Sequence, residues 1–302
     1  MFFSILITMN TDNIYKELTA TEREKWHLFC DYLKYNRRFL INKLFLQNDS
    51  ILQDPHKLFN KIKINLTPNE NYKFYRARIG YSGVDKHDKK QPFPPSEMGR
   101  PPIEKCTTPY RANPIGISYL YLASNIETAL KEVRAKEGDY VTIAEIKIVG
   151  RKYENDTKLE IIDLTKANSL TEEEIGSDTG ILKAFANHMS LPIEKDTAPI
   201  DYVPTQFLSE LIKDLNYDGI KYKSSLSDKN GVNYVLFQQS DSAENIKNFS
   251  PNDGSVFIKK TFLVRVNKIG HTMISGEIEN ELSLIPVLIK SRGMEVFMAQ
   301  NH

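Results

Sequence analysis

Apolar positions alternate along some parts of the chain and follow helical spacing in others. β-Branched and aromatic runs predict strands at residues 72–79, 117–123, 141–149, 160–164, 220–224, 233–237 and 256–266, with a weaker apolar run at 282–289. Helical spacing predicts helices at residues 170–190 and 205–215, and helical structure over about residues 12–60. This mixture predicts an α+β fold with a mixed central sheet and an N-terminal helical segment.

The N-terminal helical segment has an apolar stripe but no chemical motif. Residues 21–24 have the pattern of a capping box, which predicts a helix start. The stripe that follows consists of Trp26, Phe29, Leu33, Leu40 and Leu44. Its aromatic residues indicate core or a docking surface rather than a ligand site.

Residues 110–134 concentrate a turn, a strand and a helix. Residues 113–116 have the Asn, Pro and Gly chemistry of a chain reversal, and alternation in the next strand puts Tyr119 and Tyr121 on one face. Residues 124–127 read as a second capping box, and the helix after it carries Glu132 on the flank of its apolar stripe. A carboxylate on a rigid helix, beside tyrosines and an arginine-bearing turn, predicts a site for a sugar–phosphate ligand.

Composition indicates an ordinary globular chain, with 302 residues, 40% of them hydrophobic and 26% charged. Forty basic and thirty-nine acidic residues leave a net charge of +1, which gives no electrostatic case for binding nucleic acid or an anionic membrane. Cys30 and Cys106 form no framework, and the six histidines have no zinc spacing, so we expect no metal site.

The first nine residues are apolar, but they lack a basic n-region and a small-residue cleavage site, so no secretory signal is expected. They are also far fewer than the roughly 20 residues that span a bilayer. We therefore expect a cytoplasmic protein. Met9 precedes a polar segment, so translation starts at either Met1 or Met9.

Several short motifs, in order along residues 72–237, resemble the RES domain, a bacterial family named for an arginine, a glutamate and a serine. The three are Arg76 in FYRAR, Glu132 in ALKEVR and Ser224 in DGIKYKSS, and the intervening motif residues are Arg111, Asn113, Gly116 and Tyr121. Ala112 departs from the pattern, because many members have an aromatic residue there. The long charged and proline-rich segment 81–108 resembles a longer subgroup with extensions at both ends, and its length indicates a lid, a binding loop or a mobile segment.

The resemblance implies an ADP-ribosyltransferase-like fold and an enzyme that degrades NAD without a cofactor, with water or inorganic phosphate as the acceptor. It implies catalytic roles for Arg76, Glu132 and Ser224. Substrate-binding roles fall to Arg111, Tyr121, Arg78, Asn113 and Tyr119, some by motif position and others because they share a strand face with a motif residue. It also implies three segments: an N-terminal helical region (1–70), a catalytic domain (71–240) and a C-terminal extension packed on it (241–302).

Each of these residues also has an ordinary structural interpretation. A strand arginine such as Arg76 commonly covers apolar surface with its stem, and a helical glutamate such as Glu132 is commonly solvated, here with Lys136 at i+4. Ser224, at a strand end, commonly bonds to backbone. No base that would activate Ser224 can be identified from the sequence, so we expect it to bind phosphate or ribose rather than to attack.

Two other functions stay open. Transfer of ADP-ribose to a macromolecule would use a Glu-x-Glu such as residues 277–279, but no Ser-Thr-Ser precedes it. A catalytically inactive protein that binds NAD is the other alternative. Compact RES proteins are commonly toxins paired with an antitoxin that has a helix-turn-helix DNA-binding domain, which implies such a partner here. The terminal regions either dock on the core, join protomers into a homo-oligomer or bind another regulator.

Overall fold

The fold is that of a computed structural model, which describes residues 18–39, 54–68, 72–150, 158–175, 179–191, 198–227, 231–237, 255–269 and 294–300. Predicted features at residues 40, 44, 277–279 and 282–289 lie outside this described part. No described helix combines the length and the apolar content that a membrane crossing requires.

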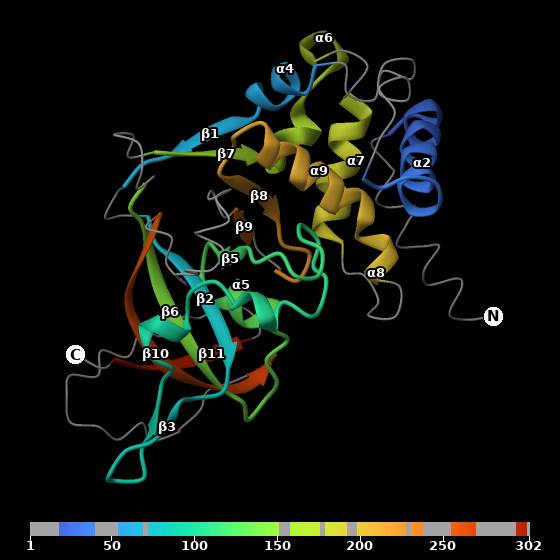
Figure 1. The fold of residues 1–302 in the computed structure, drawn as a ribbon. Helices are drawn as coiled ribbons and strands as arrows, with labels where there is room; N and C mark the ends of the chain where they lie inside the picture. The colour runs from blue at the N-terminus through green and yellow to red at the C-terminus, as the bar shows by residue number, and fades with distance from the viewer. Residues whose placement is uncertain are drawn as a thin grey trace.

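Nine of the described strands form one mixed sheet in the order β1-β7-β8-β9-β5-β2-β6-β10-β11 (Figure 1). They are β1 (Lys63–Leu66), β2 (Phe74–Ile79), β5 (Leu120–Ala123), β6 (Tyr140–Ile148), β7 (Leu159–Asp163), β8 (Gly219–Lys223), β9 (Val232–Leu236), β10 (Val256–Ile269) and β11 (Met294–Gln300). β7 and β8 pair in parallel, and the other neighbours pair antiparallel. The predicted α+β class with a mixed central sheet is confirmed.

The connection from β7 to β8 carries most of the helices, because two parallel strands need a long crossover. It contains η3 (Leu164–Ser169), α6 (Glu172–Ile175), α7 (Thr179–Ser190), α8 (Ala198–Asp201) and α9 (Val203–Asp214). α7 and α9 contact β8, and the helices gather at that end of the sheet (Figure 1). Two further helices lie outside this connection. α4 (Pro55–Asn60) lies at the same end of the sheet, and α5 (Ile126–Glu132) packs against β2 and β5 (Figure 1).

The predicted N-terminal helix is α2 (Ala20–Tyr35), which packs against α7 and α9. Trp26 is fully buried and donates from Nε1 to Nε2 of His188 on α7 over 2.9 Å. Burial lowers the pKa of His188 to about 4, so the ring is neutral at pH 7 and its Nε2 can accept this bond. α7 approaches α2 closely at Gly180, where an added Cβ would lie 2.4 Å from Cγ of Glu22.

Neither predicted capping box forms at the predicted residues. The box at the start of α2 is formed by Thr19 and Glu22, two residues before the predicted one. At α5 the cap is Asn125, which accepts from the backbone N–H of Thr128. Ser124 instead extends the pairing of β5 with β9, because its backbone and hydroxyl both bond to Val232.

Residues 81–108 contain regular secondary structure. They form a two-stranded hairpin, β3 (Gly83–Val84) with β4 (Lys90–Gln91), and the short 3-10 helices η1 (Pro95–Glu97) and η2 (Ile103–Lys105). Arg100 is buried and donates to the carbonyls of Leu236 and Phe237 over 2.6 and 2.8 Å. This anchor ties the segment to the end of β9.

The strand β10 lies in the same sheet as the motif-bearing strands, because it pairs with β6 from Val256 to Arg265. A β-bulge interrupts this register between Ile258 and Lys260. The division of the chain at residues 70 and 240 stays a prediction.

Replacing Trp26 by Ala removes the largest fully buried side chain between α2 and the crossover helices. We expect the free energy of unfolding to fall by about 3–5 kcal/mol, because transfer and cavity costs add. Leu28 on the same helix is 59% exposed, so Leu28→Ala should change it by less than about 0.5 kcal/mol. Urea unfolding of both variants checks this. Equal losses of unfolding free energy would contradict the role of Trp26 in packing α2 against the helices of the β7–β8 connection.

Candidate active site

A cavity of about 860 Å³ lies where β2 and β5 diverge. The registered pairing of these two strands is confined to Tyr75 and Ala123, and the cavity is lined by the residues of both strands around and beyond that pair. The other walls come from α5, the segment before β5, α8 and the ends of β8 and β9. Its volume falls within the roughly 300–1,000 Å³ of small-molecule and cofactor sites.

Two side chains hold one oxygen of the Glu132 carboxylate in this cavity. The hydroxyl of Ser224 donates to Oε1 over 2.7 Å, and Nδ2 of Asn233 donates to the same atom over 2.6 Å. No described residue donates a hydrogen bond to Oε2. The carboxylate is therefore fixed through one oxygen, which leaves Oε2 to interact with a ligand.

Three elements bring Glu132, Ser224 and Asn233 together. Glu132 is the last residue of α5, where the helix dipole disfavours a negative charge, so the two donors offset an unfavourable position. Ser224 follows β8 directly, and its backbone N–H donates to the carbonyl of Gly231. Asn233 lies on β9 opposite Tyr222, so the β8–β9 register decides that both donors reach the helix end.

Arg76 spans the gap between the diverging strands. Its Nη1 donates to the carbonyl of Tyr121 over 3.3 Å, and its buried Nε has no partner among the described residues. Surrounding protein atoms lower the pKa of Arg76 to about 10 by desolvation, so the guanidinium remains charged at pH 7. A charged group with an unused donor at a cavity wall is suited to an anionic ligand.

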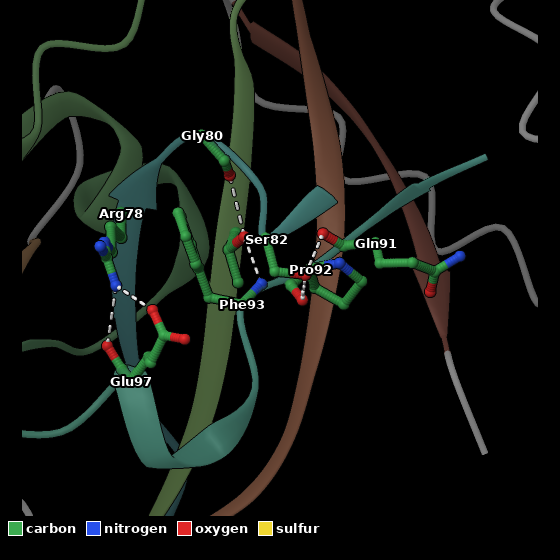
Figure 2. Close-up of polar contacts among 8 residues, drawn as sticks. Arg78, Gly80, Ser82, Gln91, Pro92, Phe93 and Glu97 are labelled. Carbon is green, nitrogen blue, oxygen red and sulfur yellow. Dashed lines mark hydrogen bonds and ion pairs between the residues drawn. The ribbon is translucent and has the colours of Figure 1, made fainter. Parts of the chain in front are cut away.

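Arg78, also predicted for this site, lines the cavity but is engaged by the 81–108 segment. Its Nη1 contacts the carbonyl of Glu97 at 3.2 Å and Oε2 of the same residue at 3.1 Å (Figure 2). Its guanidinium also lies 3.7 Å from the ring centroid of Phe93, a cation–π contact. Glu97 therefore offsets part of the charge of Arg78, since both side chains are partly exposed.

Arg111, in the segment before β5, also lines the cavity. Its Nη1 donates to the carbonyl of Met189 near the end of α7 over 2.7 Å. Its own carbonyl accepts from the hydroxyl of Thr205 on α9 over 2.6 Å. The position of Arg111 thus depends on the two crossover helices that α2 packs against.

Asn113 and Tyr121 hold each other. The Tyr121 hydroxyl donates to Oδ1 of Asn113 over 2.6 Å and accepts from the backbone N–H of Ala112 over 3.3 Å. Nδ2 of Asn113 donates to the carbonyl of Ile117 over 2.7 Å. Burial raises the pKa of Tyr121 well above its usual value, so it stays a neutral phenol with its ring at the cavity.

Tyr119 shares the cavity wall with Tyr121, as alternation predicts, but 98% of it is buried, and its ring packs 4.9 Å from Phe237. Sequence reasoning missed other lining residues, namely Asn233, Tyr222, Tyr202, Tyr110 and Arg134. Asn233 could have been found from its place opposite Tyr222, but that pairing is known only once the register of β8 and β9 is known. Burial raises the pKa of Tyr222 far above its usual range, so it is also neutral.

The cavity is strongly cationic although the chain is almost neutral. Its charged lining residues are Arg76, Arg78, Arg111, Arg134 and Lys105, against the carboxylate of Glu132. In the described part of the chain, histidines, cysteines and carboxylates form no cluster that could hold a metal. The arrangement can bind a polyanion with aromatic groups and place one carboxylate against it.

Double-mutant cycles test whether Asn233 and Glu132 are coupled. Each single alanine variant should lower the free energy of unfolding by nearly as much as the double variant does. In urea unfolding this corresponds to a coupling energy of about 1–2 kcal/mol. Glu127 on the same helix pairs with Lys131 instead, so its cycle with Asn233 should give a coupling near zero. Additive losses for Asn233 and Glu132 would contradict the bond.

Comparison with known proteins assigns the family. The chain matches the RES domain model over residues 86–253, which contain Glu132 and Ser224, while Arg76 precedes them. No characterised protein sequence gave a significant match. Among solved structures, a chain of the M. tuberculosis MbcT–MbcA toxin–antitoxin complex is similar with 13% identity and a TM-score of 0.35, over 68% of this chain and 88% of that one. The domain match spans more than half of the chain, which therefore belongs to the RES domain family.

Proposed function

We propose that this protein degrades NAD by cleaving the bond between nicotinamide and ribose. The observation that carries the proposal is the carboxylate of Glu132, held through Oε1 by Ser224 and Asn233 in a cationic, tyrosine-lined cavity. NAD has a pyrophosphate for the arginines and a flat, cationic nicotinamide ring for a tyrosine face. Membership of the RES domain family supports the same substrate.

The proposed reaction needs charge stabilisation more than acid catalysis. Nicotinamide leaves as a neutral pyridine and takes no proton, so the barrier lies in forming an oxocarbenium-like ribose. A fixed carboxylate next to that carbon stabilises the developing positive charge, and glycosidases use the same principle. In our proposal Oε2 of Glu132 has this role, acting through the ribose hydroxyls or by orienting the acceptor.

The remaining residues divide into binding and positioning roles in this proposal. Arg76 and Arg111 bind the pyrophosphate, with Arg78 as a further contact, and Tyr121 packs on the nicotinamide riboside. Asn113 positions Tyr121, and Ser224 positions Glu132. Ser224 is hydrogen-bonded to the carboxylate rather than to a histidine or lysine, which fits positioning better than nucleophilic attack.

Nicotinamide release from NAD by the purified protein tests the proposal, measured with and without inorganic phosphate. We expect Glu132→Gln to lower the rate by about 10²–10³-fold, because it removes a preorganised electrostatic contact. The phosphate dependence distinguishes the acceptors, because water gives ADP-ribose and phosphate gives the 1″-phosphate of ADP-ribose.

The matched control is Glu127→Gln, which alters a carboxylate on the same helix that pairs with Lys131. This variant should retain close to wild-type turnover. Full turnover by Glu132→Gln would exclude the assigned role, and no release by wild-type protein in either buffer would contradict the proposed function.

The cellular role that we propose is that of a toxin that depletes NAD and is neutralised by an antitoxin with a helix-turn-helix DNA-binding domain. This part rests on the family alone. Expression of the wild-type chain in a bacterium should lower cellular NAD and stop growth, while Glu132→Gln at equal protein level should do neither. Growth arrest by both the wild-type chain and the variant would show that toxicity does not depend on the proposed chemistry.

A further inference from the structure

α5 ends in a Schellman motif with an unusual residue at its centre. The backbone N–H of Arg134 donates to the carbonyl of Lys131, and that of Ala135 donates to the carbonyl of Leu130, the two bonds that define this motif. Arg134 consequently adopts φ +52°, in the left-handed region. Glycine is the usual residue there, because a side chain makes that conformation unfavourable.

A second helix of the same fold shows the common solution. α9 ends with the same two bonds, from Asn216 to Lys213 and from Tyr217 to Ile212, and Asn216 has φ +62°. Asparagine tolerates this region because its short side chain can bond locally. Arginine has no such compensation, so α5 carries a costly residue where glycine or asparagine would be easier.

The position of the Arg134 side chain gives a functional reason for an arginine here. The side chain is exposed and lines the active-site cavity two residues after Glu132. Arg111, Arg134 and Glu132 all act on Tyr202, whose pKa is raised chiefly by burial; the two arginines lower it and Glu132 raises it further. These four groups therefore gather at one end of the cavity.

Among the arginines that line the cavity, Arg134 also forms the fewest contacts through its guanidinium with described residues. Arg76 donates to Tyr121, Arg78 contacts Glu97, and Arg111 donates to Met189. The guanidinium of Arg134 forms no hydrogen bond or ion pair with a described residue. Backbone strain held at a cavity wall is typical of functional positions, and an uncommitted guanidinium fork fits the geometry of a phosphate.

We propose that Arg134 is a substrate-binding residue that contacts a phosphate group at the Glu132 end of the cavity. The proposal rests on the proposed function and adds to it a phosphate contact beyond those assigned to Arg76 and Arg111. Two sources share this chemistry: the pyrophosphate of the dinucleotide, and free phosphate that serves as acceptor. The C-terminal end of α5 helps to hold the cation, because the helix dipole is negative there.

The test uses a substitution at residue 134 that should favour stability but weaken binding. Arg134→Gly relieves the backbone, so its unfolding midpoint should match or exceed that of wild-type protein. Its affinity for a phosphate-bearing probe should fall about tenfold, because a charge-assisted contact is lost. Arg134→Lys keeps the charge without the fork and should bind with intermediate affinity. Asn216→Gly is the matched control, because it changes the equivalent helix end outside the cavity.

Calorimetric titration with ADP-ribose and, separately, with inorganic phosphate distinguishes the two sources. Weaker ADP-ribose binding by Arg134→Gly would assign the contact to the pyrophosphate, and weaker phosphate binding alone would assign it to the acceptor. Either result supports the inference when Asn216→Gly binds like wild-type protein. Wild-type affinity of Arg134→Gly for both probes would overturn the inference and leave the proposed function intact. Wild-type protein that binds neither probe would overturn both.

Discussion

The site depends on the early separation of two neighbouring strands. β2 and β5 have one registered pair, Tyr75 with Ala123, and the cavity begins where that pairing stops. Arg76 spans the gap and contributes a guanidinium whose Nε is unused by described residues. Because α5 starts directly after β5, the same divergence decides where the helix end and its carboxylate lie. A fully paired sheet would close this space with backbone hydrogen bonds.

The N-terminal helix, which lies outside the RES domain match, supports the walls of this cavity indirectly. α2 lies before the matched residues, and Trp26 holds His188 on α7. The next residue of α7, Met189, accepts the hydrogen bond from Arg111. Lys34 of α2 pairs with Asp201 at 2.8 Å, at the end of the helix whose Pro199 lines the cavity. The N-terminal helix is thus part of the support for the site.

Periodicity in the sequence predicts most of the elements, because buried strands and amphipathic helices impose it on the residues that they bury. Boundaries are weaker: Thr19 and Thr21 both fit a cap, and Ser124 belongs to the sheet rather than to the helix start. The motif residues Glu132 and Ser224 could be found from the sequence, and the structure brings them into contact. Asn233 and Arg134 could not, because one depends on strand register and the other on a backbone angle. Such features arise only when the elements pack.

In the proposed function, one fixed carboxylate faces the ribose of NAD in this cavity. A crystal structure of the Glu132→Gln variant with NAD bound measures that directly, since slow turnover should preserve the dinucleotide. We predict the nicotinamide ribose in hydrogen-bonding reach of residue 132, the pyrophosphate against Arg76 and the nicotinamide beside Tyr121. A dinucleotide bound elsewhere, or one with its adenine end at residue 132, would contradict the account.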